Sequence, residues 1–268
     1  MNFSISDRLA GLIGGAVLAF SATAAQAADL PSLKAPEAPP AVDDFQPFFV
    51  KVGFTYVLNT TSSNLSGQSP TALARGITTA FPSGVGATIG DVPTLGFESG
   101  IYVTRHISVN IGGGIPMYVN DKTVGFNPAN PVLANGTVLT RLMPAFVPMT
   151  VNWHFDNFGP IRPYIGAGIA PGFSFSNQNA FLTGVHVGNS IGAVIAAGAD
   201  YMIDRHWGVS LDVKKTFAYV ESYADGMNIP GVGVVPAKVY QNTHFEPWAF
   251  SLGILYRFGP SDIPFLKY

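Results

Sequence analysis

Residues 248–258 read WAFSLGILYRF, and this stretch decides the fold of the chain. Every second residue from Trp248 to Phe258 is large and apolar, whereas the residues between them are mostly small and include Arg257. Because a β-strand places successive side chains on opposite faces, one face is apolar and the other is small or charged. In a soluble sandwich the charged face would meet water. In a membrane barrel the apolar face would meet lipid and the other face would line the interior.

The composition favours the membrane barrel. Only 11% of the 268 residues are charged, whereas soluble domains have about 25%. Hydrophobic residues make up 47% of the chain, but no apolar run reaches the 18 or so residues that a transmembrane helix needs. A high apolar content that is dispersed along the chain is typical of alternating strands.

Several classes of function receive no support from the sequence. The net charge of −2 argues against nucleic acid as a partner. The chain has no cysteine, which excludes disulfides and thiolate chemistry. Its histidines lack paired metal-ligand spacing, and no G-x-S-x-G nucleophile motif is present. We therefore predict that the protein is not an enzyme and has no catalytic site, cofactor or metal.

The N-terminus resembles a secretory signal peptide over residues 1–27. Arg8 supplies the positive region, residues 9–20 are apolar, and residues 25–27 read AQA, a typical cleavage site. We expect residues 28–47, which are rich in proline, to form an extended periplasmic segment. The protein is thus predicted to be exported.

Eight segments alternate between apolar and polar residues. They cover residues 48–58, 94–104, 107–117, 142–155, 161–175, 190–202, 207–220 and 248–258. Most are 11 to 14 residues long, whereas soluble strands average about 5–6 and membrane-spanning strands need about 9–11. The length of these segments indicates strands that cross a membrane.

The connections between these segments alternate in length. The short ones are residues 105–106, 156–160 and 203–206, and the long ones are residues 59–93, 118–141, 176–189 and 221–244. This alternation is typical of outer-membrane barrels, which have short periplasmic turns and long extracellular loops. We therefore predict an all-β fold, an eight-stranded antiparallel transmembrane β-barrel over residues 48–258, followed by a C-terminal tail at 259–268.

Charged and tyrosine residues share the interior parity of the strands. The predicted lumen-lining residues are Lys51, Glu98, Tyr102, Arg162, Tyr164, Asp200, Asp212, Lys214 and Arg257. Arg141, Lys215 and Glu246 fall on the lipid parity or beside it, at the long-loop end, where a charge costs least.

The lumen of an eight-stranded barrel is barely wider than its side chains. Because buried charges need partners, we expect Arg162 and Arg257 to pair with the acidic residues of the lumen-lining set. This arrangement has two interpretations: a charge-balanced plug that specifies the fold, or a selective constriction.

Several motifs resemble the OmpW family of outer-membrane proteins. Residues 160–168 (PIRPYIGAG) resemble the fifth strand of that family. Residues 197–201 (AGADY), with Trp207 and residues 211–214 (LDVK), resemble its sixth and seventh strands. The resemblance implies a bacterial outer-membrane location and contact with the lipid bilayer and lipopolysaccharide.

The last strand also resembles the signal by which outer-membrane barrels are recognised for assembly. Its matching positions are Ser251, Gly253, Tyr256 and Phe258. The resemblance implies the outer-membrane assembly machinery as a partner. The family usually ends on the last aromatic residue, whereas this chain continues to Tyr268.

The resemblance implies a narrow channel for the passive passage of small, hydrophobic molecules, with a lateral exit toward lipid. Pro144 and Pro148 lack the backbone donor that strand pairing needs. They indicate either a lateral opening or a strand end that protrudes above the membrane. The alternative function is a closed structural or adhesive barrel that acts through its external loops.

Overall fold

The computed structural model describes residues 45–71, 81, 84–126 and 133–262. The predicted signal peptide (1–27) lies outside the described residues, as do residues 28–44 of the proline-rich segment and 263–268 of the tail. Within the described ranges, no helix is long and apolar enough to cross a membrane.

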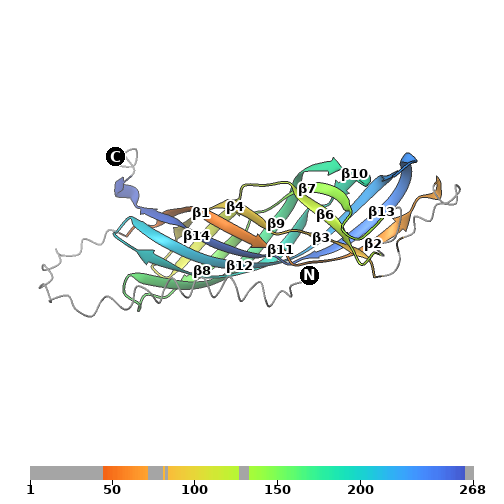
Figure 1. Cartoon of the computed structure of the whole chain (residues 1–268). Helices are drawn as coiled ribbons and strands as arrows, with labels where there is room; N and C mark the ends of the chain where they lie inside the picture. The colour runs from red at the N-terminus through yellow and green to blue at the C-terminus, as the bar shows by residue number, and fades with distance from the viewer. Residues whose placement is uncertain (1–44, 72–80, 82–83, 127–132, 263–268) are drawn as a thin grey trace, which may run out of the picture. The chain divides into compact units, whose positions relative to one another are not determined.

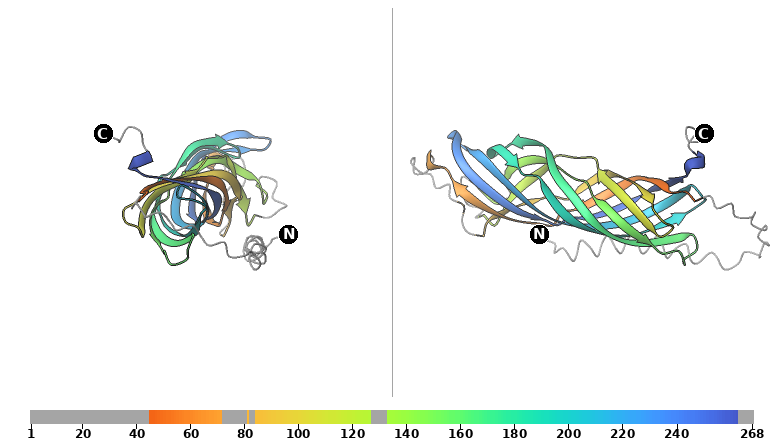
Figure 2. Two further views of the ribbon diagram at one scale, coloured as in Figure 1. Left: turned by 90° about the vertical axis from the view of Figure 1, so that its left-hand side faces the viewer. Right: turned by 180° about the vertical axis from the view of Figure 1, so that it is seen from behind.

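Eight antiparallel strands close into a ring (Figure 1). They are β1 (Phe48–Leu58), β4 (Val92–Tyr102), β5 (Ile107–Gly114), β8 (Met149–His154), β9 (Ile161–Asn179), β11 (Ser190–Met202), β12 (Trp207–Ile229) and β14 (Trp248–Phe258). Each strand pairs with the next, and β14 pairs with β1 along its whole length. The end-on view in Figure 2 shows the strands arranged around a common axis. The fold is the predicted eight-stranded β-barrel.

The bounds of β1, β11 and β14 agree with the predicted segments, whereas the fourth segment is divided. It forms β7 (Val138–Phe146) and β8, which are separated at Val147 and Pro148. Strands β9 and β12 continue beyond their predicted ends, to Asn179 and Ile229.

The long connections contain further strands that were not predicted from the sequence. These are β2 (Thr61–Gln68), β3 (Gly86–Ile89), β6 (Val119–Val124), β10 (Leu182–Val187) and β13 (Gly233–Phe245). Together with β7 and the outer part of β12 they continue the barrel wall past the ring. We call this part of the molecule the extension.

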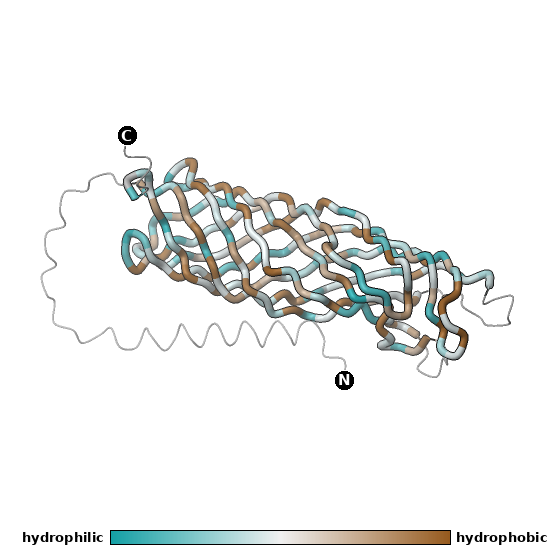
Figure 3. The backbone as a smooth tube through the Cα atoms, turned by 90° about the horizontal axis from the view of Figure 1, so that it is seen from above, coloured by the Kyte–Doolittle hydropathy of each residue, from teal (hydrophilic) through white to brown (hydrophobic). Residues whose placement is uncertain are grey.

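The eight-strand ring has an apolar outer face, as a lipid-contacting surface requires. Large apolar side chains exposed on it include Val52, Phe54, Leu95, Phe97, Val109, Ile111, Val151, Trp153, Ile165, Ile169, Ile195, Leu252 and Ile254. So large an exposed apolar surface marks contact with a membrane and not with water. Figure 3 shows the underlying alternation of hydrophobic and hydrophilic residues along the strands.

The extension reverses this polarity. Its outer face carries Asn120, Lys122, Arg141, Glu221 and Lys238, all exposed. Much of its interior is apolar, and we call the buried apolar cluster there the apolar cap. The apolar cap consists of Leu65, Val85, Ala87, Phe126, Leu133, Leu139, Phe181, Leu182, Ala224, Met227, Ile229, Val235, Ala237 and Val239. The extension therefore has the polarity of a water-soluble β-structure and lies outside the membrane-spanning segments.

Glycines allow a close approach where the ring closes. Gly53 of β1 lies opposite Gly253 of β14, and a Cβ atom added at Gly53 would collide with the backbone of Leu252. We predict that Gly53→Val disrupts the β1–β14 pairing, because the backbone on the other side cannot move without breaking the ladder. The barrel should then no longer run as a compact, heat-sensitive band on an unboiled denaturing gel.

Gly90→Val is the matched control, since a Cβ atom at Gly90 would meet no atom within 4 Å. This variant should keep the heat-sensitive band. A Gly53→Val protein that folds as well as the control would show that the contact between β1 and β14 has room for a larger side chain.

Candidate functional site

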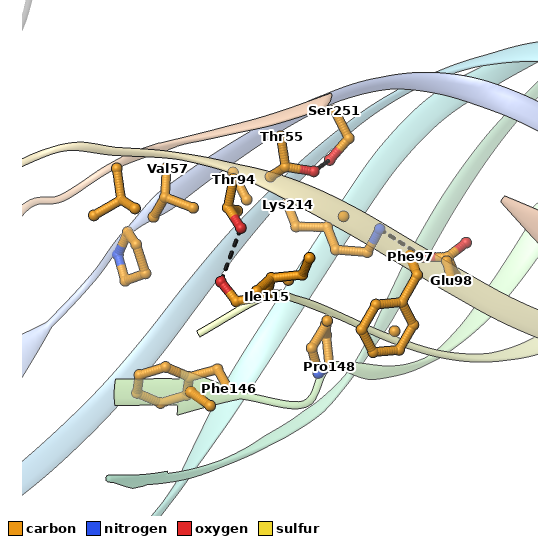
Figure 4. A pocket seen from close by; sticks show the side chains of 18 of the residues that line it. Thr55, Val57, Thr94, Phe97, Glu98, Ile115, Phe146, Pro148, Lys214 and Ser251 are labelled. Atoms are coloured by element: carbon orange, nitrogen blue, oxygen red, sulfur yellow. Dashed lines mark hydrogen bonds and ion pairs between the residues drawn. The ribbon is translucent and has the colours of Figure 1, made fainter. Parts of the chain in front are cut away.

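A cavity of about 200 Å³ lies in the lumen between the polar interior of the ring and the extension. Glu98 and Lys214 lie at its polar side, and Val57, Ile115 and Phe146 are among its apolar walls (Figure 4). We call it the large cavity. Ligand sites for drug-sized molecules occupy about 300–1,000 Å³, so the large cavity suits a smaller molecule.

Buried ion pairs fill the lumen below the large cavity. This polar network consists of Lys51, Glu98, Tyr164, Asp200, Asp212 and Lys214. The Lys51 ammonium lies 2.9 Å from Asp200 and 3.7 Å from Glu98, and it donates to the Tyr164 hydroxyl at 3.3 Å. The network closes through Lys214, which contacts Glu98 at 2.7 Å and also pairs with Asp212. All six residues belong to the predicted lumen-lining set.

Aromatic and basic side chains fill the ring below the polar network, near the short turns. Arg257 donates to the backbone carbonyl of Gln46 at 2.9 Å and lies 4.4 Å from the centre of the Tyr102 ring. Tyr102 in turn packs on Phe49 and His154. We expected the arginines to pair with the acidic residues of the lumen. Instead, Lys51 and Lys214 bind the carboxylates, and Arg257 contacts a backbone carbonyl and an aromatic ring. Arg162 lies directly opposite Asp200 in the strand register.

The charged residues on the lipid parity lie at the border between the ring and the extension. Lys215 donates to the Glu246 backbone carbonyl at 2.5 Å and lies 3.4 Å from the Glu246 carboxylate. The rings of Phe217 and Trp248 flank its ammonium. Lys215 is only 8% exposed, so these partners cover most of its side chain. Arg141 is exposed on the outer face of β7.

The four residues of the resembled assembly signal lie on both faces of β14. Ser251 faces inward and shares a hydrogen bond of 2.9 Å with Thr55, and Gly253 lies against Gly53. The Tyr256 ring packs on Trp207, and the Phe258 ring stacks on Phe48. Their role in assembly stays a prediction.

The wall beside the large cavity has an interruption in its strand pairing. The β5–β8 ladder ends at the pair Ile111–Met149, followed by a bond from the Gly112 amide to the Pro148 carbonyl. Pairing resumes only where Val119 meets Leu142 in the β6–β7 ladder. We call the interval between residues 113–118 and 143–147 the window.

Both sides of the window line the large cavity. One side contributes Ile115 and Met117, whose side chains are about half exposed. Pro144 and Phe146 lie on the other side, next to Pro148. The structure therefore places both predicted prolines at the interrupted part of the wall, where neither can donate to a neighbouring strand.

A buried carboxylate in the extension was not predicted from the sequence. Asp121 on β6 is 1% exposed, and its carboxylate accepts a hydrogen bond of 3.0 Å from the side chain of Gln241 on β13. The alternation of Val119, Asp121 and Thr123 with exposed polar residues is the pattern that could have revealed it. That pattern lies within the segment that was interpreted as a loop.

We predict that Lys51→Met destabilises the barrel by about 3–5 kcal/mol, because it leaves Asp200 buried without the lysine that pairs with it. Unfolding in denaturant, with the protein reinserted in lipid vesicles, measures the change. Lys238→Met is the matched control, since its ion pair with Asp225 is exposed to solvent and should contribute little. Equal stability of both variants would contradict a structural role for the polar network.

Burial raises the pKa of Asp121 to about 7, although the hydrogen bond from Gln241 opposes this shift. An acid whose pKa is raised on folding makes its full contribution to stability below its unfolded pKa, near 4, and loses it as the pH rises to 7. We predict that the extension loses up to about 4 kcal/mol between pH 4 and pH 7. Hydrogen exchange of β6 and β13 against pH measures this loss.

Asp121→Asn removes the titrating group and should flatten that pH dependence. The variant and the wild type should exchange at similar rates near pH 4, where both side chains are neutral. A wild-type protein whose extension is equally protected from pH 4 to pH 8 would contradict the predicted shift.

The chain has recognisable relatives. The model of the OmpW family matches residues 47–258. The chain is 38% identical over 111 residues to an uncharacterized outer-membrane protein, y4mB, of Sinorhizobium fredii, which covers 41% of this chain and 45% of that protein. It is 31% identical over 107 residues to the dibenzothiophene metabolism operon protein PahQ of Pseudomonas aeruginosa, covering 38% and 50% respectively. The matched part spans about half the length of these two relatives.

The crystal structure of the outer membrane protein OprG from Pseudomonas aeruginosa has a similar fold. The TM-score is 0.66 at 18% identity, and the match covers 81% of this chain and 97% of OprG. Since the family model spans nearly all of the described barrel, the chain belongs to the OmpW family and is an outer-membrane protein.

Proposed function

We propose that the barrel is a narrow channel through which small, hydrophobic molecules pass the outer membrane, leaving the lumen sideways through the window. One observation carries the proposal. The large cavity adjoins the interrupted wall, whereas charged side chains fill the lumen below it.

The lining of the large cavity supports an apolar solute. Its walls toward the window are formed by Ile115, Met117, Pro144 and Phe146, with few hydrogen-bonding groups among them. Ile115 and Met117 are about half exposed. We infer that a solute in the large cavity would leave between these apolar side chains, where the strand pairing is interrupted.

The polar network opposes the direct route to the periplasm. An apolar solute moving straight down would have to separate Lys51 from Asp200 and Lys214 from Glu98. A buried charge that loses its partner costs several kcal/mol. Movement from the large cavity into lipid exchanges one apolar environment for another and has no such penalty. The lateral exit is therefore the favoured route.

The relatives agree with this proposal. PahQ of Pseudomonas aeruginosa is named for an operon of dibenzothiophene metabolism, and dibenzothiophene is an apolar aromatic molecule. We propose that hydrophobic solutes of this kind also pass through the present barrel. The channel needs no chemistry, so we propose that the protein is not an enzyme. Contact with lipopolysaccharide and with the assembly machinery belongs to the same proposal.

Uptake of an apolar fluorescent aromatic into vesicles with a lipopolysaccharide outer leaflet tests the function. Vesicles that contain the wild-type barrel should take up the probe faster than protein-free vesicles. We predict that Gly113→Leu brings uptake close to the protein-free rate. A Cβ atom at Gly113 has ordinary contacts with the Phe97 ring at 3.5 Å and the Phe146 carbonyl at 3.7 Å, so the first carbon of the new side chain causes no collision at the window. A barrier raised by about 1.4 kcal/mol already slows passage about tenfold.

Gly90→Leu is the matched control, because the same side chain is added where it meets open space. Both variants should keep the heat-sensitive barrel band. If Gly113→Leu transports as fast as the control, the lateral route is wrong. If the wild-type barrel itself does not accelerate uptake, the channel function is wrong.

A further inference from the structure

The interior of the extension has a polar layer between two apolar ones. Along the inward face of β13, Val239 belongs to the apolar cap, Gln241 and Thr243 follow, and Phe245 lines the large cavity. Strand β6 shows the same order, since Val119 lines the large cavity and Asp121 comes next on the same face. A hydrogen-bonding layer thus lies directly above the large cavity.

The bond between Asp121 and Gln241 spans the lumen. Strand β6 pairs with β3 and β7, and β13 pairs with β12 and β2, so the two strands are not neighbours in the wall. The Gln241 side-chain amide donates to Asp121 at 3.0 Å and lies 3.3 Å from the Thr243 hydroxyl. The pair therefore stands across the interior of the extension.

The carboxylate of Asp121 keeps unused hydrogen-bonding capacity. Among the described residues its Oδ1 atom is buried without a hydrogen-bond partner. The charged residues of the strands around it, Lys122, Arg141, Glu221 and Lys238, are exposed on the outer face. A buried polar atom without a partner costs about 1–3 kcal/mol, which a ligand that hydrogen-bonds to it would recover.

A small cavity of about 10 Å³ adjoins the pair. Its lining includes Asp121, Thr140, Ser222 and Gln241, together with apolar side chains such as Leu142. This volume is about that of one water-sized group. A hydroxyl group therefore fits beside the carboxylate, whereas a larger polar group does not.

Both cavities are lined by β6, the large cavity at Val119 and the small one at Asp121. Asp121 and Val119 are two residues apart on one strand face, which corresponds to about 7 Å. A molecule with its polar end at Asp121 would reach the large cavity with its apolar part after a short distance.

We propose that Asp121 and Gln241 bind the hydroxyl group of a small amphiphile, an alcohol or a phenol, whose apolar part extends into the large cavity. The proposal rests on the proposed function in that it names the class of solute the channel selects. Burial raises the pKa of Asp121 to about 7, so near neutral pH its carboxyl group can accept from the ligand and, when protonated, donate to it.

The test compares 1-hexanol with 1-fluorohexane, which has a similar size but no hydroxyl group. The full-length mature barrel is embedded in lipid nanodiscs with aspartate labelled by ¹³C at the carboxyl group, and empty nanodiscs correct for partition into lipid. Hexanol should shift the Asp121 carboxyl resonance in a saturable way. It should bind about tenfold more tightly than fluorohexane, as expected for hydrogen bonds to a buried carboxyl group.

Three variants show which residues cause the preference for hexanol over fluorohexane. Asp121→Leu and Gln241→Leu should each bind both probes with similar affinity. Gln241→Leu keeps the Asp121 carboxyl group. If Asp121→Leu does not fold, the binding of the two probes to Gln241→Leu is sufficient to test the site. Thr123→Val is the matched control, since Thr123 is the next inward residue on β6 and its hydroxyl already donates to the Ala134 carbonyl at 2.7 Å. This control should keep the preference for hexanol.

The outcomes separate this proposal from the channel function. Equal binding of both probes to the wild type, or loss of the preference in Thr123→Val, overturns the hydroxyl site. If the apolar aromatic is still taken up in that case, the channel function stands without it. A preference for hexanol that disappears in both leucine variants supports the site, even in a barrel that does not accelerate uptake.

Discussion

The antiparallel pairing of β1 with β14 is the interaction on which the rest of the structure depends. Within a bilayer no water is available to satisfy the backbone, so a sheet can cross only if its edges pair with each other. The pairing runs from Phe48–Phe258 to Leu58–Trp248 without a register shift. Once the ring is closed, strand parity decides which side chains meet lipid and which are enclosed. The polar network, the large cavity and the window all follow from that closure.

Parity explains how much of the fold could be predicted from the sequence. The bounds of β1, β11 and β14 were predicted correctly because apolar residues recur at every second position along each of them. Strands β6 and β13 were missed although they alternate just as regularly. The inward face of β13 begins with Val235, Ala237 and Val239, the outward faces carry exposed polar residues such as Asn120, Lys122 and Lys238, and both strands lie among turn-forming residues. The alternation was present in the sequence, but its outward face is not the uniformly apolar face of a lipid-facing strand.

The interior was predictable residue by residue but not as a set of contacts. Parity placed Lys51 and Asp200 inside, whereas their ion pair depends on two strands that meet across the lumen. The Asp121–Gln241 contact joins residues 120 positions apart and lies beyond the reach of local patterns for the same reason. Pro144 was more accessible to prediction, since a missing backbone donor is a local property whose effect on pairing does not depend on distant residues.

The filled lower lumen has a consequence for the cell envelope as an electrical and osmotic barrier. An ordinary pore admits its solute through a column of water, and ions leak along the same path. Here the side chains of Lys51, Asp200, Tyr164 and their neighbours are buried where such a column would run. A barrel of this design that releases its solute sideways would separate the uptake of hydrophobic molecules from the leakage of ions. Many copies could then be present without making the membrane permeable to ions.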